Sequence, residues 1–395
     1  MLLVYLAQCA WLIRAQTVHG FLPDSDHALC IYDGLEQWKG KAIAATPEAL
    51  HAEAATGMPS AGRAGHLRVR DGYDVDRTPF YYLVAAAPAL VQPDVLATNS
   101  PLGQIWGATP YLFFGFMLGA SLWYVSRRLY GDAGGYIALT LYCFSPGMIL
   151  AAAGTKSFGE LGGTWGAFGT IFTAIAAAHT LYAPREVVLW NWRRIFLLGL
   201  SVALAVGTQV SLAVVALAAL LLMFWVAPVR PRAVIAIWGA AVGVGAVYVF
   251  AFYFFQPRLF GQALLRARWT DIEPHAFAMI TSYSHTWKMM AANCPAFMLA
   301  LPVALIAYCT WRRARYFGNS APLFVGAMLF ALAVASPDLP AQGFELAMTV
   351  FLFVFAGGVF ADLLETKGRV FVTAGIGGLL VASGVWNFVQ LWRLR

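Results

Sequence analysis

Charged side chains are scarce in this chain of 395 residues. Asp, Glu, Lys and Arg together make up 11% of it, whereas an ordinary soluble domain carries about 25% charged residues. Hydrophobic residues make up 60%, and they recur in runs of about 20 residues, the length that a helix needs to cross a bilayer. The composition therefore excludes an ordinary soluble domain and indicates an all-α polytopic membrane protein.

Cysteine is also rare, and the five cysteines show no CxxC pattern and no spacing typical of metal ligands. The sequence therefore predicts no metal site built on cysteine. Cys30 and Cys294 could both lie outside the membrane and are the candidate pair for a disulfide. The simpler interpretation is that the cysteines are unpaired thiols in apolar surroundings.

The apolar runs predict about eleven membrane helices, and residues 1–395 are expected to form a single transmembrane domain. The first is a retained helix at 1–18, because it lacks the basic start and the cleavage site of a signal peptide. The others are expected at 108–126, 134–153, 162–181, 195–208, 211–227, 233–255, 291–311, 320–336, 343–363 and 370–391. The sequence has no internal repeat, and we expect no soluble domain after the last segment.

A net charge of +7 would fit a nucleic-acid-binding protein, but the Lys and Arg residues stand singly or in pairs between apolar runs. Clusters such as Arg127–Arg128 and Arg312–Arg313 fall at every second boundary, as the positive-inside rule predicts. The rule is obeyed only if the segment 79–91 does not cross, and at about 13 residues it is too short to do so. Residues 21–107 then form one long external loop.

This external loop combines length with acidic residues outside the membrane. Asp24 and Asp26 precede the segment 28–38, whose apolar residues recur at helical spacing opposite a polar face that includes Gln37. That pattern predicts an amphipathic helix lying on the membrane surface. We interpret the segment 79–91 as a second interfacial or re-entrant helix.

Six short motifs occur in an order that resembles the GT-C glycosyltransferases, in particular the branch of protein mannosyltransferases and lipid A aminoarabinose transferases. Each motif is unspecific alone, and the resemblance rests on their order. The motifs are Pro23-Asp24-Ser25-Asp26-His27, Arg77-Thr78-Pro79-Phe80-Tyr81-Tyr82, Ser126-Arg127-Arg128-Leu129-Tyr130-Gly131, Phe144-Ser145-Pro146, Glu160 in the following turn, and Gly207-Thr208-Gln209.

The resemblance implies a membrane glycosyltransferase that moves a sugar from a polyprenyl-phosphate carrier to an acceptor on the outer face. It also implies a bacterial inner membrane, with the loop on the periplasmic side. The expected partners are the lipid-linked sugar donor, membrane lipids and other proteins of a membrane complex, and no nucleic acid. No cofactor is implied; Asp74 and Asp76 could bind a divalent cation, but a solvated turn paired with Arg77 is the favoured interpretation.

Asp26, with Asp24 beside it, is the candidate catalytic base, because a carboxylate must take the proton of the attacking hydroxyl. Capping of the surface helix is the alternative role for either aspartate. Cations must also stabilise the departing lipid phosphate, and arginine suits that role, although anionic headgroups would attract it too. The candidate substrate-binding residues are Glu160, Lys156, Arg258, Arg266, Arg268 and Tyr81.

Two departures from the family pattern favour a second hypothesis, a catalytically inactive GT-C-like scaffold subunit of a larger complex. The acidic pair reads Asp26-His27 where the family has Asp-Glu, and Gln209 stands where relatives often have lysine. A transporter is the third hypothesis, and it ranks last because no repeat is found and the acidic residues concentrate in a surface loop.

Overall fold

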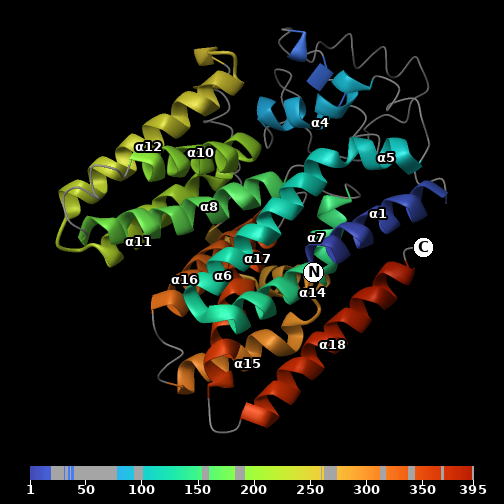
Figure 1. Cartoon of the computed structure of the whole chain (residues 1–395). Coiled ribbons are helices and arrows are strands. Elements are labelled where there is room, and N and C mark those ends of the chain that lie inside the picture. Colours follow the sequence, from blue (N-terminus) through green and yellow to red (C-terminus); the bar gives the residue numbers. More distant parts are fainter. Residues whose placement is uncertain are drawn as a thin grey trace.

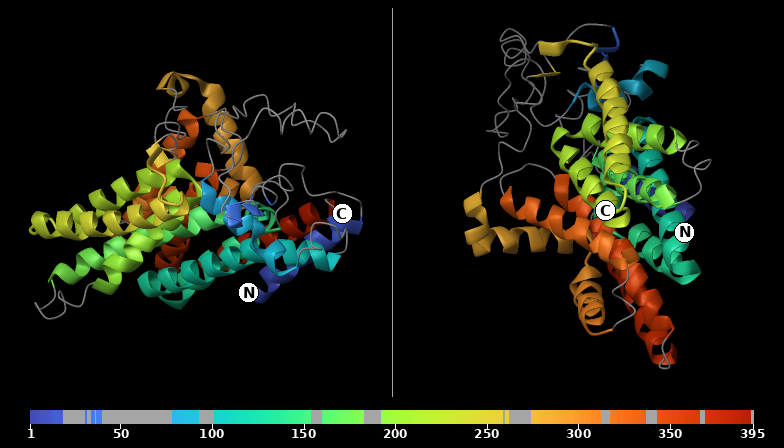
Figure 2. Two further views of the ribbon diagram at one scale, coloured as in Figure 1. Left: turned by 90° about the horizontal axis from the view of Figure 1, so that it is seen from above. Right: turned by 90° about the vertical axis from the view of Figure 1, so that its left-hand side faces the viewer.

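The computed structural model describes most of the chain as a bundle of helices (Figures 1 and 2). Within the described ranges every regular element is a helix. These ranges are 1–18, 31, 34–35, 37–39, 78–92, 101–153, 160–182, 192–258, 260–261, 274–311, 317–336, 343–365 and 369–393.

The α-helices of the first two thirds of the chain are α1 (Leu2–Val18), α4 (Pro79–Val91), α5 (Pro101–Gly107), α6 (Thr109–Cys143), α7 (Pro146–Ala152), α8 (Glu160–His179), α10 (Trp192–Thr208), α11 (Val214–Val226) and α12 (Pro231–Phe252). The later α-helices are α14 (Ile280–Asn293), α15 (Phe297–Thr310), α16 (Phe317–Ala335), α17 (Gly343–Leu364) and α18 (Arg369–Arg393). Short 3-10 helices cover Thr180–Tyr182, η3 (Val210–Ala213) and Pro274–Ala278.

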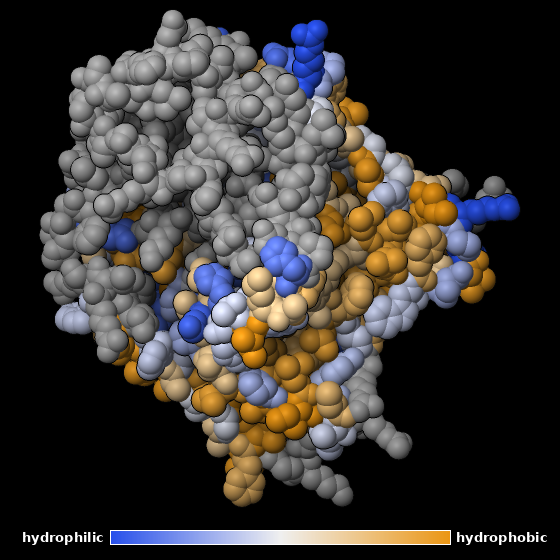
Figure 3. All heavy atoms as spheres, turned by 180° about the vertical axis from the view of Figure 1, so that it is seen from behind, coloured by the Kyte–Doolittle hydropathy of each residue, from blue (hydrophilic) through white to orange (hydrophobic). Residues whose placement is uncertain are grey.

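Five of the described helices are long and apolar enough to cross a membrane, and seven spans result if each of two bent helix pairs counts as one. Large apolar side chains lie exposed on the outside of the bundle, among them Val247 on α12, Ile306 on α15 and Phe371 on α18. Figure 3 shows such apolar residues spread over the described surface on one side of the molecule. The count of about eleven spans remains a prediction.

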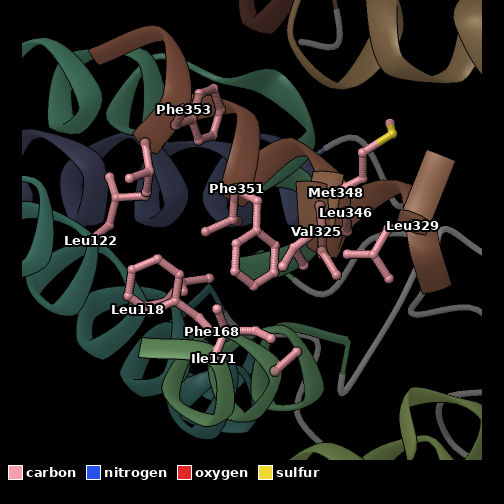
Figure 4. Close-up of a cluster of buried hydrophobic side chains, with 14 of the residues drawn as sticks. Leu118, Leu122, Phe168, Ile171, Val325, Leu329, Leu346, Met348, Phe351 and Phe353 are labelled. Carbon is pink, nitrogen blue, oxygen red and sulfur yellow. The ribbon is translucent and has the colours of Figure 1, made fainter. Parts of the chain in front are cut away.

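Helix α17 lies at the centre of the bundle and packs against α6, α8, α15 and α16. In its most apolar window 89% of the residues are buried, which is expected of a helix that is hydrophobic on every side. Phe351 of α17 lies 5.9 Å from Phe168 and 6.1 Å from Phe172 of α8, measured between ring centroids. Figure 4 shows this aromatic and aliphatic core between α6, α8, α16 and α17.

Small residues allow α8 and α10 to pack with their backbones close together. A Cβ atom added at Gly166 of α8 would lie 2.8 Å from Ala205 Cα and nearer still to the backbone nitrogen of Ala205. One at Gly169 would lie 2.7 Å from the Ser201 hydroxyl. Close packing through glycine is a common basis of helix association in membranes, where apolar surface alone gives no driving force between helices.

The motif Ser126–Gly131 ends in a sharp turn at Gly131 within α6. Gly131 has φ of 73°, a left-handed conformation that glycine adopts without the steric cost of a side chain. The Arg127 Nε donates to Asp132 Oδ1 at 2.6 Å across the turn, and the Tyr130 hydroxyl donates to the Gly318 carbonyl of α16. Gly131 therefore separates the expected spans 108–126 and 134–153, but the second of these is not one helix, because α6 ends at Cys143 and α7 begins at Pro146.

Two breaks between helices lie side by side, one between α6 and α7 and the other between α14 and α15. The second arm of α6 ends at Cys143, and Ser145 is the N-cap of α7. Helices α14 and α15 are bent by 108° across the break at 294–296, which interrupts the expected span 291–311. The Ser145 hydroxyl donates to the Asn293 carbonyl at 2.5 Å, so one break supplies a hydrogen bond to the other. Backbone groups freed within a membrane protein need such partners because lipid offers none.

Helix α18 lies at the edge of the bundle, and only 11% of its most apolar window is buried. Its buried face carries Asn387, whose Nδ2 donates to Gln8 Oε1 of α1 at 2.6 Å. The Nε2 of Gln8 in turn donates to the Cys143 carbonyl at 3.0 Å. Figures 1 and 2 show the end of α18 close to α1. The two hydrogen bonds of Gln8 therefore link α18 through α1 to the end of α6.

Candidate functional site

The surface segment before α4 packs on α4 with its apolar residues. Residues 31, 34, 35, 37 and 38 are helical, and Ile31 clusters with Ala85, Ala86 and Ala89. The Trp38 Nε1 donates to the Leu83 carbonyl at 3.0 Å. The described residues of this segment are therefore helical and lie against α4, while a surface helix over 28–38 remains a prediction.

Gln37 departs from that prediction. The sequence pattern places it on the polar face, but its side chain is fully buried. Gly34, one turn earlier, lies directly against α4, since a Cβ atom there would come 2.6 Å from Ala86 Cβ. Gln37 shares the face of Gly34, because residues three apart lie on one side of a helix.

Helix α4 is anchored by its first turn to the ends of α10 and α12. Phe80 stacks on Phe252 of α12 with ring centroids 4.5 Å apart. Both rings lie beside Gly207 at the end of α10, where an added Cβ atom would be 2.8 Å from Phe252 and 3.7 Å from Phe80. The next residue, Tyr81, is a predicted site residue, and its side chain is buried.

Glu160 forms the first residue of α8 and is half-buried. The backbone dipole of a helix favours a negative charge at this end, which gives Glu160 a structural role as well. One turn on, Gly162 and Gly163 lie against Thr208 of α10, as added Cβ atoms would be 3.4 Å and 3.2 Å from its side chain. Glu160 and the α4 anchor therefore flank the same end of α10.

Gln209 is the residue that replaces the lysine of the family pattern, and it is buried beside this end of α10. Its Nε2 donates to the Ser211 hydroxyl in η3 at 2.6 Å. The amide thus serves a hydrogen bond within the turn, and it carries no charge that could hold a phosphate.

Arg258 is exposed just beyond α12. The chain turns between them through Phe254 and Phe255, whose φ values are 51° and 55°. Two successive left-handed residues with bulky side chains are uncommon and strained. The turn follows the end of α12 that contacts α4, so Arg258 lies near the end of the bundle that carries Tyr81 and Glu160.

The other predicted site residues, Asp24, Asp26, Lys156, Arg266 and Arg268, lie outside the described residues, as do Asp74, Asp76 and Cys30. Among the residues that are described, no group of three or more His, Cys, Asp or Glu side chains could hold a metal ion. Cys294 is a buried, unpaired thiol, so it does not form the disulfide considered with Cys30.

No protein-family model and no curated protein sequence matches this chain significantly. Solved structures do match it. ArnT from Cupriavidus metallidurans bound to undecaprenyl phosphate aligns with a TM-score of 0.62 and 12% identity, over 99% of this chain and 70% of ArnT. The chain has the GT-C fold.

The archaeal oligosaccharyltransferase AglB from Archaeoglobus fulgidus, in complex with an inhibitory peptide and a dolichol-phosphate, aligns with a TM-score of 0.53 and 12% identity. That alignment covers 81% of this chain and 48% of AglB, so the chain spans about half of the archaeal protein. The Archaeoglobus fulgidus oligosaccharyltransferase in complex with Zn and sulfate aligns over 80% of this chain with a TM-score of 0.51 and 12% identity. The GT-C fold and the apolar helices make this chain an integral membrane protein.

Sequence reasoning missed two polar residues of this region. Gln37 and Thr78, the latter at the N-cap of α4, are both fully buried, and neither side chain has a hydrogen-bond partner. Thr78 belongs to a motif that the sequence singled out, but Gln37 has the spacing of an exposed residue. The sequence pattern does not show that the face carrying Gln37 is covered; the close approach of Gly34 to α4 shows it in the structure.

Proposed function

We propose that this GT-C protein is a membrane glycosyltransferase that moves a sugar from a polyprenyl-phosphate carrier to an acceptor on the outer face. The observation that carries the proposal is the likeness of almost the whole chain to ArnT bound to undecaprenyl phosphate. The packing of the first turn of α4 and of the start of α8 beside the same end of α10 supports it, because α4 follows the loop that carries the predicted catalytic aspartates in the sequence.

The transfer needs a base, a grip on the leaving group and a bound lipid. The acceptor hydroxyl attacks the anomeric carbon, the bond from that carbon to the phosphate oxygen breaks, and the polyprenyl phosphate departs. Asp26, assisted by Asp24, takes the hydroxyl proton. Arg258, Arg266, Arg268 and Lys156 stabilise the charge that develops on the leaving phosphate, and Glu160 and Tyr81 orient the sugar.

The membrane arrangement that goes with this function has about eleven spans. The protein lies in a bacterial inner membrane with residues 21–107 on the periplasmic side. The arginine clusters at alternate boundaries support that orientation, because positive residues remain on the cytoplasmic side.

Transfer is tested with purified protein in nanodiscs and radiolabelled undecaprenyl-phosphate-linked sugars. We expect Asp26→Ala to abolish transfer while it keeps the thermal stability of the natural protein, and Glu160→Gln to reduce transfer. Asp132→Ala is the matched control, since Asp132 is an exposed carboxylate at the Gly131 turn, away from α4. Undiminished transfer by Asp26→Ala would reject Asp26 as the base.

A non-catalytic scaffold is the second candidate, and Gln209 favours it. A neutral amide engaged with Ser211 cannot neutralise a phosphate as lysine does. The two functions predict different results for the natural protein. A scaffold transfers no sugar with any donor and co-purifies with other membrane proteins, whereas an enzyme transfers sugar when purified alone.

A further inference from the structure

We propose that Gln37 and Thr78 form a neutral hydrogen-bonding subsite for the hydroxyl groups of the donor sugar, a subsite that rests on the proposed glycosyltransferase function. Gln37 belongs to the surface segment and Thr78 to the N-cap of α4, so the subsite lies in the seam between them. In this subsite Gln37 and Thr78 contact the sugar of the donor, and not its phosphate or its lipid tail.

The first observation is the absence of partners for these side chains. Neither Nε2 nor Oε1 of Gln37 has a hydrogen-bond partner, and neither does Oγ1 of Thr78. Both side chains are 0% exposed. Buried polar groups in proteins almost always have a partner, and one without it costs about 1–3 kcal/mol. A ligand with hydroxyl groups would satisfy all three atoms.

The second observation is the register between the surface segment and α4. Ile31 clusters with Ala85, Ala86 and Ala89, whereas Gly34 lies against Ala86 and Tyr82, so the two helical segments run in opposite directions. Gln37 lies three residues beyond Gly34, and Thr78 lies four residues before Tyr82. Each is therefore one helical turn from the same point of contact, towards the same end.

The chemistry of the two side chains selects the ligand class. A carboxamide offers two N–H donors and one acceptor oxygen, and a hydroxyl donates once and accepts. This set matches neighbouring hydroxyls of a sugar ring, each of which also donates and accepts. A phosphate requires donors that are charged or numerous, and neither residue is a cation. The subsite is therefore suited to the neutral part of the donor.

Aromatic side chains complete the arrangement. Tyr81 and Tyr82 follow three and four residues after Thr78, one helical turn on, and both are buried with ring centroids 5.6 Å apart in an edge-to-face arrangement. On the helix they therefore share the face of Thr78. Ligand sites commonly combine apolar walls with a few placed polar groups that fix orientation.

Gln37→Met and Thr78→Val test the subsite, because they remove the polar atoms and nearly keep side-chain volume. Binding to the full-length protein in nanodiscs is measured for undecaprenyl phosphate alone and for the same carrier bearing a pentose, a hexose or an aminopentose. We expect each variant to bind the preferred sugar-bearing probe about 2- to 12-fold more weakly, the effect of one hydrogen bond. Binding of the bare carrier stays unchanged.

Thermal stability gives a second readout that separates this role from a structural one. If the two side chains serve only a ligand, their replacement by apolar groups leaves the apparent Tm of the ligand-free protein unchanged or raises it. Gln92→Met is the matched control, since Gln92 is an exposed glutamine at the other end of α4. We expect it to bind every probe as the natural protein does.

Three results would overturn the inference. In the first, both variants bind the sugar-bearing and bare probes as the natural protein does; in the second, the natural protein prefers no sugar-bearing probe over the bare carrier. In the third, the variants have a lower apparent Tm and bind the sugar-bearing and bare probes more weakly by the same factor. The proposed function survives the first result if transfer persists, whereas failure to bind even the bare carrier would end both proposals.

Discussion

Replacing Gly166 by alanine should drive α8 and α10 apart and disturb the end of the bundle where the candidate site lies. The added Cβ would lie 2.8 Å from both Ala205 Cα and the Leu204 carbonyl carbon. Ordinary contacts between carbon atoms are about 3.5–4.0 Å, so the helices must separate by roughly 1 Å. The atoms in the way belong to the backbone of α10, which cannot rotate aside as a side chain can.

The magnitude follows from two opposing terms. Alanine is favoured over glycine inside a helix by about 1 kcal/mol, which alone would stabilise α8. Overpacking a tight interface costs about 1–3 kcal/mol, and more where backbone must move. Gly239→Ala on α12 isolates the first term, because a Cβ there has nothing within 4 Å. We therefore expect Gly166→Ala to be less stable than Gly239→Ala by about 1–3 kcal/mol.

Apparent Tm in detergent, followed by tryptophan fluorescence and by retention of the monodisperse peak after heating, measures the difference. Gly239→Ala should match or exceed the natural protein, and Gly166→Ala should fall below it. Glycan transfer should also fall in Gly166→Ala, because α8 carries Glu160 and α10 carries Thr208. A Gly166→Ala protein as stable as Gly239→Ala would refute the close backbone contact between the two helices.

Two further substitutions test the polar contacts between helices. Asn387→Leu removes the hydrogen bond to Gln8 and should weaken the association of α18 with the bundle by about 0.6–2 kcal/mol. We expect faster hydrogen exchange in α18 and unchanged exchange in α17. Equal exchange of α18 in the variant and the natural protein would count against the bond. Ser145→Ala removes the 2.5 Å hydrogen bond to the Asn293 carbonyl and should destabilise the protein by about 0.5–2 kcal/mol, measured as a lower apparent Tm. Ser201→Ala is the control: it loses only a hydrogen bond within its own helix and should change the apparent Tm little.

Local sequence rules predicted the elements that are determined by their own residues. Pro79 is tolerated in the first turn of a helix, and the apolar run ends at Val91, so the predicted bounds of α4 agree with the structure. The motif ending in Gly131 predicted a boundary, and the left-handed glycine supplies it. The order of motifs also pointed to the GT-C fold, which the likeness to ArnT confirms.

Features that depend on distant contacts were not predictable in the same way. The sharp bend before Phe297 lies in an apolar run that the sequence pattern predicts to be one span. The Asn293 carbonyl at this bend accepts its hydrogen bond from the hydroxyl of Ser145, which is 148 residues away. Gln37 has the spacing of a solvent-facing residue, and only packing on α4 buries it. The positions of Asp24 and Asp26 relative to Glu160 remain a prediction, because both aspartates lie outside the described residues.

The hydrogen bond between Gln8 and Asn387 joins residues 379 positions apart, and this affects how the protein is made. Ribosomes add about 5–20 residues per second, so the amide of Gln8 waits roughly 20–80 seconds for Asn387 to be synthesised. The Nε2 of Gln8 finds its partner, the Cys143 carbonyl, well before then, so during synthesis the amide oxygen is the part of Gln8 that waits for the last helix. The contact between α1 and α18 is therefore the last of these two to form as the chain is made.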